Sequence, residues 1–176
     1  MSFRAAGRVL PGLLACCLLF LPGCGYRFGD RAGMLPDRIR TVYVAPWGNR
    51  TNVLELGARI TEALRREFLL GGGLVLADRA EADVILEGEV VAVDTTGLSY
   101  TRYDVAVERN VRVEVSARLR DRRTGEVLWE TVNLRRDEPF LVGANVQDTE
   151  SLEALAFEKI GHNLAELIYH RVTGMF

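Results

Sequence analysis

Cys24 is the residue of this sequence whose chemistry most needs an explanation. The chain has three cysteines, and Cys24 is the only one outside an apolar N-terminal run. A lone cysteine serves as a catalytic thiol, half of a disulfide, a small buried side chain or a point of attachment. A catalytic thiol needs an activating histidine, and His162 and His170 lie far away on a predicted helix. The sequence therefore favours a role for Cys24 that is not catalytic.

The residues before Cys24 have the pattern of an export signal. Arg4 and Arg8 form a positive start, and the segment 9–21 is apolar but too short to cross a bilayer well. A small residue, Gly23, precedes the cysteine. The stretch "LPGC" resembles the lipobox of bacterial lipoproteins, in which the cysteine becomes the acylated first residue of the mature chain. The alternative is a buried N-terminal helix, which the internal "PG" pair and the lack of a polar face disfavour.

Cleavage at this site would divide the chain into three parts. We expect a lipoprotein signal peptide over residues 1–23, a lipidated tether over 24–37 and a single α/β domain over 38–176. The only cysteine left in the mature chain, Cys24, then has no disulfide partner. By analogy with lipoprotein sorting, Gly25 favours attachment to the periplasmic side of the outer membrane through this lipid anchor.

The remaining candidate groups do not form the pattern of a catalytic or metal site. His162 and His170 are eight residues apart, and no cysteine or further histidine lies nearby to complete a metal shell. Glu87 and Glu89 fit the solvent face of a strand better than an acid–base pair. We therefore predict no enzyme activity, no metal and no cofactor beyond the covalent N-terminal lipid. The formal net charge of −2 gives no sign of a nucleic-acid partner.

The mature chain shows strand and helix patterns in the order β-α-β-β-β-β-α. This order predicts an α+β two-layer sandwich, in which a mixed, mainly antiparallel sheet of about four to five strands carries both helices on one face. Asn52 and Glu55 are expected to cap the first helix, and the glycines 71–73 to end it. Asp148 or Thr149 is expected to cap the last helix. The predicted strands are 39–47, 74–78, 80–94, 103–120 and 127–134, and the helices run from about 52 to 70 and from about 148 onward.

The segment 103–120 has the clearest strand pattern, because apolar and polar residues alternate over most of its length. An apolar face and a wet face are typical of an antiparallel strand. Arg109 interrupts the apolar series, and a bulge or an edge position explains it better than a binding role. The polar residues 95–103 are expected to form an exposed hairpin loop.

Arginine supplies nearly all the positive charge, since Lys159 is the only lysine. Codon composition in a GC-rich genome accounts for most of this bias. Arg102 nevertheless stands out, because Tyr100 and Tyr103 flank it in the predicted loop. A cation and aromatic rings placed together suit a charged amphiphile.

Four stretches of the chain resemble the lipopolysaccharide-assembly lipoprotein family, LptE. They are "GCGYRF" at the mature N-terminus, "IRTVYVAPWGNRTN", "EADVILEGEV" and "VRVEVSARLRDRRTGEVLWE". The resemblance covers residues 24–176. It implies a two-layer domain that is tethered to the inner leaflet of the outer membrane and plugs a large β-barrel of the LptD type, helping to assemble it and to deliver lipopolysaccharide.

The resemblance also implies which residues contact the lipid. Members of the family contact lipopolysaccharide through basic residues at the loop end of the sheet, and Arg102 is the match by position. A second basic contact of the family lies before the last helix, but residues 140–148 contain no arginine or lysine. The alternative hypothesis is a lipid-anchored periplasmic adaptor or regulator of another envelope machine, such as peptidoglycan synthesis.

Overall fold

The computed structural model describes residues 38–100 and 106–174. The predicted signal peptide and tether lie outside these residues, and so do the two predicted site residues, Cys24 and Arg102. Within the described part of the chain, neither helix has the length and apolar composition needed to cross a membrane.

The strands of the described domain form one sheet in the order β3-β1-β4-β5-β6, and the short β2 also pairs with β4. β1 runs parallel to β3 and β4, whereas β4, β5 and β6 form an antiparallel meander. The predicted mixed, mainly antiparallel sheet is therefore confirmed. In chain order the elements are β1 Thr41–Val44, β2 Gly48–Asn49, α2 Leu56–Gly71, β3 Val75–Leu76, β4 Val84–Tyr100, β5 Ala106–Asp121, β6 Val127–Leu141 and α3 Val146–Thr173.

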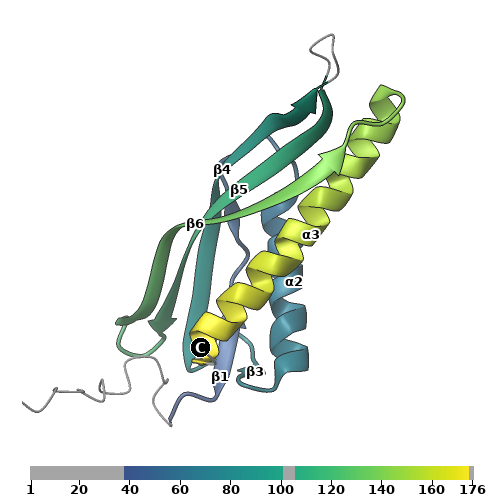
Figure 1. Ribbon diagram of the computed structural model, residues 1–176. Helices are drawn as coiled ribbons and strands as arrows, with labels where there is room; N and C mark the ends of the chain where they lie inside the picture. Colours follow the sequence, from purple (N-terminus) through teal and green to yellow (C-terminus); the bar gives the residue numbers. More distant parts are fainter. Residues whose placement is uncertain (1–37, 101–105, 175–176) are drawn as a thin grey trace, which may run out of the picture. The chain divides into compact units, whose positions relative to one another are not determined.

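Both helices cover the same face of the sheet, as predicted (Figure 1). α3 runs diagonally along β5 and β6 and packs beside α2, which lies over the β1 side of the sheet. The covered face of the sheet and the facing sides of the helices share one hydrophobic core. Its members include Val42, Leu86, Val113, Val115 and Leu119 from the sheet and Ile60, Leu64, Phe68, Ile160, Leu164 and Ile168 from the helices.

β5 has the alternation that the sequence predicts. From Val111 to Leu119 the odd-numbered side chains are buried under the helices, and the intervening polar ones point to the other face. Arg109 has the parity of the buried series but is exposed. The register of β4 shifts opposite Arg109, between Gly97 and Ser99. The expected bulge is thus confirmed, although the extra residue lies in the partner strand.

Two strands are longer than predicted. β4 continues to Tyr100, so most of the loop predicted at 95–103 is strand. β6 continues to Leu141 instead of ending near residue 134. Both extensions pair with the first half of β5. Backbone pairing along β5 overrides the turn-like composition of these segments, because an unpaired strand edge is unfavourable.

The predicted helix caps were wrong, whereas the predicted helix stop is confirmed. α2 follows Glu55, which is left-handed with a φ of 61°, and no side chain caps it, so Asn52 is not the cap. At α3 the side chain of Asn145 accepts a hydrogen bond from the Asp148 N–H, so Asp148 is capped rather than capping. α2 ends as expected at Gly72, whose φ of 69° favours glycine.

Gly57 and Gly161 provide a matched test of helix packing. A Cβ at Gly57 would lie 2.6 Å from the carbonyl oxygen of Trp47, whereas one at Gly161 would meet Ile60 Cγ1 at 3.9 Å. Because alanine favours a helix over glycine, Gly161→Ala should raise the free energy of unfolding by about 0.5–1 kcal/mol. Gly57→Ala should lower it despite the same preference, since the clash is with backbone. Urea unfolding measures both, and equal shifts would contradict the close approach at Gly57.

Candidate functional site

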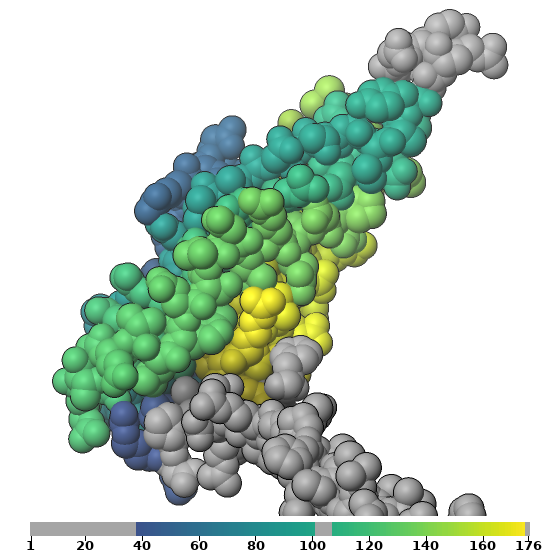
Figure 2. Space-filling model, turned by 60° about the vertical axis from the view of Figure 1, so that its left-hand side comes forward, coloured from purple at the N-terminus to yellow at the C-terminus, as the bar shows by residue number. Residues whose placement is uncertain are grey.

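The sheet face opposite the helices carries cross-strand ion pairs. Glu87 on β4 lies 3.0 Å from Arg118 and 2.7 Å from Arg120, both on β5. Opposite charges at neighbouring strand positions stabilise such a face. The further pairs are Arg50–Glu89 at 2.7 Å, Arg135–Glu114 at 2.8 Å and Arg112–Asp137 at 2.7 Å. We call these residues the charged face. β4, β5 and β6, which carry most of it, form a continuous surface in Figure 2.

Glu87 is held in its ionised form. Its partial burial opposes ionisation, but hydrogen bonds from Arg118 and Arg120 outweigh burial and hold its pKa below the usual value. A carboxyl with a lowered pKa is a poor proton donor at neutral pH. A hollow of about 460 Å³ adjoins it, lined largely by polar side chains that include Arg50 and Ser116. The charged face therefore presents mainly charged and polar side chains to its surroundings.

The first described residue, Arg38, contacts Asp121 at the end of β5. This carboxylate is only 1% exposed, and Arg38 Nη2 lies 2.6 Å from its Oδ2. Its Oδ1 accepts hydrogen bonds from the backbone N–H groups of Arg123 and Thr124, in the turn between β5 and β6. Arg38, the first described residue, is thus fastened to this turn.

Asp83 fastens the next residues of the same junction. Its carboxylate accepts hydrogen bonds from the backbone N–H groups of Arg40 and Thr41 and from the Thr41 hydroxyl. The Arg40 hydrogen bond is the main cause that lowers the pKa of Asp83, and burial acts against it. We call Arg38, Arg40, Thr41, Asp83 and Asp121 the tether junction. It holds the first described residues against the sheet and the turn between β5 and β6.

The tether junction gives the domain a pH-dependent stability. The hydrogen bonds from the Thr124 N–H and from Arg38 lower the pKa of Asp121 from 3.8 to about 2. The unfolded chain binds a proton at Asp121 more readily than the folded domain does. The stability that ionised Asp121 contributes is therefore present above about pH 4 and is lost as pH falls toward 2. Asp121→Asn should lower stability at pH 7 and lose less stability than the parent between pH 4 and 2. Urea unfolding at each pH measures this, and equal losses would contradict it.

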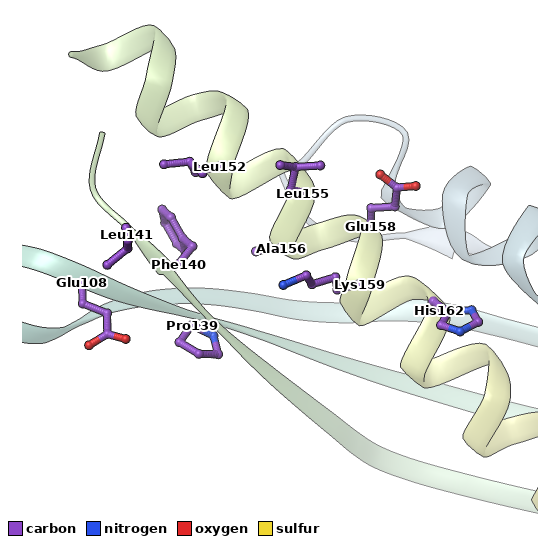
Figure 3. Close-up of a pocket in the computed structure, with 10 residues that line it drawn as sticks. All are labelled: Glu108, Pro139, Phe140, Leu141, Leu152, Leu155, Ala156, Glu158, Lys159 and His162. Carbon is purple, nitrogen blue, oxygen red and sulfur yellow. The ribbon is translucent and has the colours of Figure 1, made fainter. Parts of the chain in front are cut away.

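A second hollow, of about 520 Å³, lies between α3 and the paired ends of β5 and β6 (Figure 3). Its lining is mainly apolar, with a polar rim that includes Glu108 and Lys159. Lys159 is paired with Glu138 at 2.9 Å, so its charge is already balanced. The apolar lining comprises Pro139, Phe140, Leu141, Leu152, Leu155 and Ala156. Such a groove suits a small apolar group.

The two histidines are not brought together. His162 lies 3.3 Å from Glu67 on α2, and His170 lies 3.8 Å from Glu166 on its own helix. Among the described residues, no three His, Cys, Asp or Glu side chains are grouped as a metal site requires.

The tether junction is the feature that sequence reasoning missed. Asp121 precedes a glycine-containing turn. From the sequence, this position predicts only that the aspartate accepts hydrogen bonds from the backbone of its own turn. Its pairing with Arg38 depends on the fold, which brings residues far apart in the chain together. No local signal in the sequence connects them.

Comparison with known proteins places the domain in context. The family model described as "LptE: Lipopolysaccharide-assembly" matches residues 39–172, which span β1 to α3. No curated protein gives a significant match to the sequence.

Solved structures share this fold at low sequence identity. A protein from Xanthomonas campestris has a TM-score of 0.58 at 14% identity, with 80% of this chain and 88% of that chain covered. The uncharacterized lipoprotein B from Nitrosomonas europaea has a TM-score of 0.52 at 20% identity, with 86% of this chain and 92% of that chain covered. The rare lipoprotein B from Shewanella oneidensis has a TM-score of 0.50 at 13% identity, with 73% of this chain and 90% of that chain covered. At these identities the likeness establishes the fold.

Proposed function

The chain belongs to the LptE lipopolysaccharide-assembly family, and from this premise we propose that it plugs and helps to assemble an LptD-type β-barrel in the outer membrane. The barrel would deliver lipopolysaccharide to the cell surface. The role is structural, with no catalytic step carried by the domain itself. The match over residues 39–172 is the observation that carries the proposal, because it spans the whole sandwich of sheet and helices.

The charged face supports this role. Large outer-membrane barrels have a polar interior, which in several cases is filled by protein. A plug must therefore present polar groups outward and keep its apolar core internal. In this domain the core lies between the sheet and the helices, and the far side of the sheet carries the Glu87 and Glu89 ion pairs. Because the charges of this face are already paired, the face can lie against a polar lumen without leaving an unpaired charge buried.

We further propose that Cys24, which lies outside the described residues, carries the lipid that anchors the protein on the periplasmic side of the outer membrane. The "LPGC" stretch supports this assignment. The Nitrosomonas and Shewanella proteins of the same fold are described as lipoproteins. Acylation of Cys24 with more than one chain would make the attachment firm, because a single chain binds membranes only marginally.

Cross-linking from the charged face tests the plug directly. A photo-reactive residue in place of Ser116, which lies on β5 opposite Glu89, should cross-link to a large outer-membrane barrel in living cells. The matched control replaces Arg79, an exposed residue in the turn between β3 and β4. Position 116 should give more barrel adduct than position 79. No barrel adduct from position 116 would contradict the plug.

Lipopolysaccharide contact is proposed at Arg102, in the segment between β4 and β5 that lies outside the described residues. Arg102→Glu should weaken lipopolysaccharide binding and leave thermal unfolding unchanged, because the substitution replaces an attractive charge with a repulsive one. Arg79→Glu, at the other end of β4, is the matched charge control and should bind as the parent does. Unchanged binding by Arg102→Glu removes Arg102 from the site.

A further inference from the structure

Exposed apolar side chains gather where α2 turns into β3. Leu69 and Leu70 are 71% and 78% exposed in the last turn of α2, and Val75 is 66% exposed at the start of β3. Single exposed apolar residues are ordinary, but three within seven positions are not scattered. We call Leu69, Leu70 and Val75 the apolar turn.

Contacts with Tyr169 of α3 hold the apolar turn in place. The Gly73 N–H, between Leu70 and Val75, donates a hydrogen bond to the Tyr169 hydroxyl at 3.2 Å. The Tyr169 ring also packs edge-on against Phe68, with centroids 5.2 Å apart. The side chains of the apolar turn therefore point outward from a fixed base.

Three exposed arginines lie on the segments that adjoin the apolar turn. Arg66 lies one helical turn before Leu70, and the backbone of Arg40 accepts a hydrogen bond from the Val75 N–H. Arg171 lies near the end of α3, which packs against Gly73 through Thr173. Within residues 38–100 and 106–174, none of these three arginines lies within ion-pair distance of a carboxylate. Exposed apolar side chains with such arginines on the adjoining segments suit the headgroup region of an anionic phospholipid layer.

The described chain begins at the same end of the domain. Arg40 belongs to the tether junction, and its carbonyl receives the Val75 N–H, so the junction and the apolar turn adjoin. Fourteen residue steps separate Arg38 from Cys24, and a chain of that length reaches at most about 50 Å. A lipid attached at Cys24 therefore keeps the membrane within reach of this end.

We propose that the apolar turn docks on the phospholipid surface that holds the lipid anchor. Leu69, Leu70 and Val75 enter the headgroup layer, and Arg40, Arg66 and Arg171 contact lipid phosphates around them. The contact would set the tilt of the domain on the membrane. It rests on the proposed lipid anchor but not on the barrel partner, so it goes beyond the plug function.

A probe at residue 70 tests this docking. Leu70→Cys in the full chain, purified as the cell makes it, is labelled with an environment-sensitive dye and reconstituted into phosphatidylethanolamine–phosphatidylglycerol vesicles. Leu155→Cys, on an exposed leucine that lines the groove on α3, is the matched control. The unsubstituted parent, labelled in parallel, gives the background from native cysteines. The dye at residue 70 should be quenched several-fold more by a lipid-borne quencher than by aqueous iodide, and the dye at residue 155 should show the reverse.

Each other outcome overturns the docking. Quenching at residue 70 by iodide alone means that the apolar turn faces water. Quenching by neither agent means that protein, such as the tether itself, covers it. A chain that does not float with the vesicles contradicts the anchor as well. Adding Arg66→Glu should reduce the lipid quenching at residue 70, and unchanged quenching excludes the phosphate contact. Because the vesicles contain no barrel, none of these results bears on the plug.

Discussion

Phe68→Ala is expected to lower the free energy of unfolding by about 3–5 kcal/mol, because it removes a large, fully buried side chain from the hydrophobic core. Phe68 is 2% exposed and meets the Tyr169 ring edge-on, at an interplanar angle of 73°. This contact joins the end of α2 to the end of α3. Since domains of this kind are stable by only about 5–15 kcal/mol, the loss is a large share of the total.

Urea unfolding followed by circular dichroism measures this loss. Leu69→Ala is the matched control, because Leu69 is the next residue of the same helix but is 71% exposed. It should change the free energy of unfolding by less than about 0.5 kcal/mol. Similar losses in the two variants would contradict the packing of α2 on α3.

Depletion of the protein from cells is expected to remove lipopolysaccharide from the cell surface and to leave the barrel unassembled. A barrel of many strands closes slowly and exposes unpaired strand edges until it closes. A domain that occupies the lumen would limit the wrong pairings available to it. The expected readouts are loss of surface lipopolysaccharide staining and a lower amount of folded, detergent-resistant barrel.

Complementation gives this experiment its control. The parent chain and Gly161→Ala should restore both readouts, because Gly161→Ala keeps the fold. Phe68→Ala should restore them poorly at high growth temperature, since a destabilised domain is degraded. Normal surface lipopolysaccharide in depleted cells would remove this role from the protein.

The layered fold was predictable because its signals are periodic. The alternation from Val111 to Leu119 and the apolar stripes of both helices follow from burial on one face. The element ends were not predictable to the same degree. The length of β6 depends on pairing with β5, and the cap of α3 at Asn145 was missed in favour of Asp148.

The candidate site was predictable only in its general character. The polar parity of Arg112, Glu114 and Arg118 predicts a charged strand face, but not which charges meet. The partners depend on the register between strands, which shifts in β4 between Val90 and Ala92. The tether junction likewise depends on a long-range contact. Cys24 and Arg102, both inferred from the sequence, stay predictions.

The plug account is tested most directly by the proteins that co-purify with the full chain from gently solubilised envelopes. The account predicts a very large outer-membrane β-barrel as the principal partner, retained through size exclusion at physiological ionic strength. Recovery of a peptidoglycan synthase without any barrel would contradict the account and would favour the adaptor hypothesis instead.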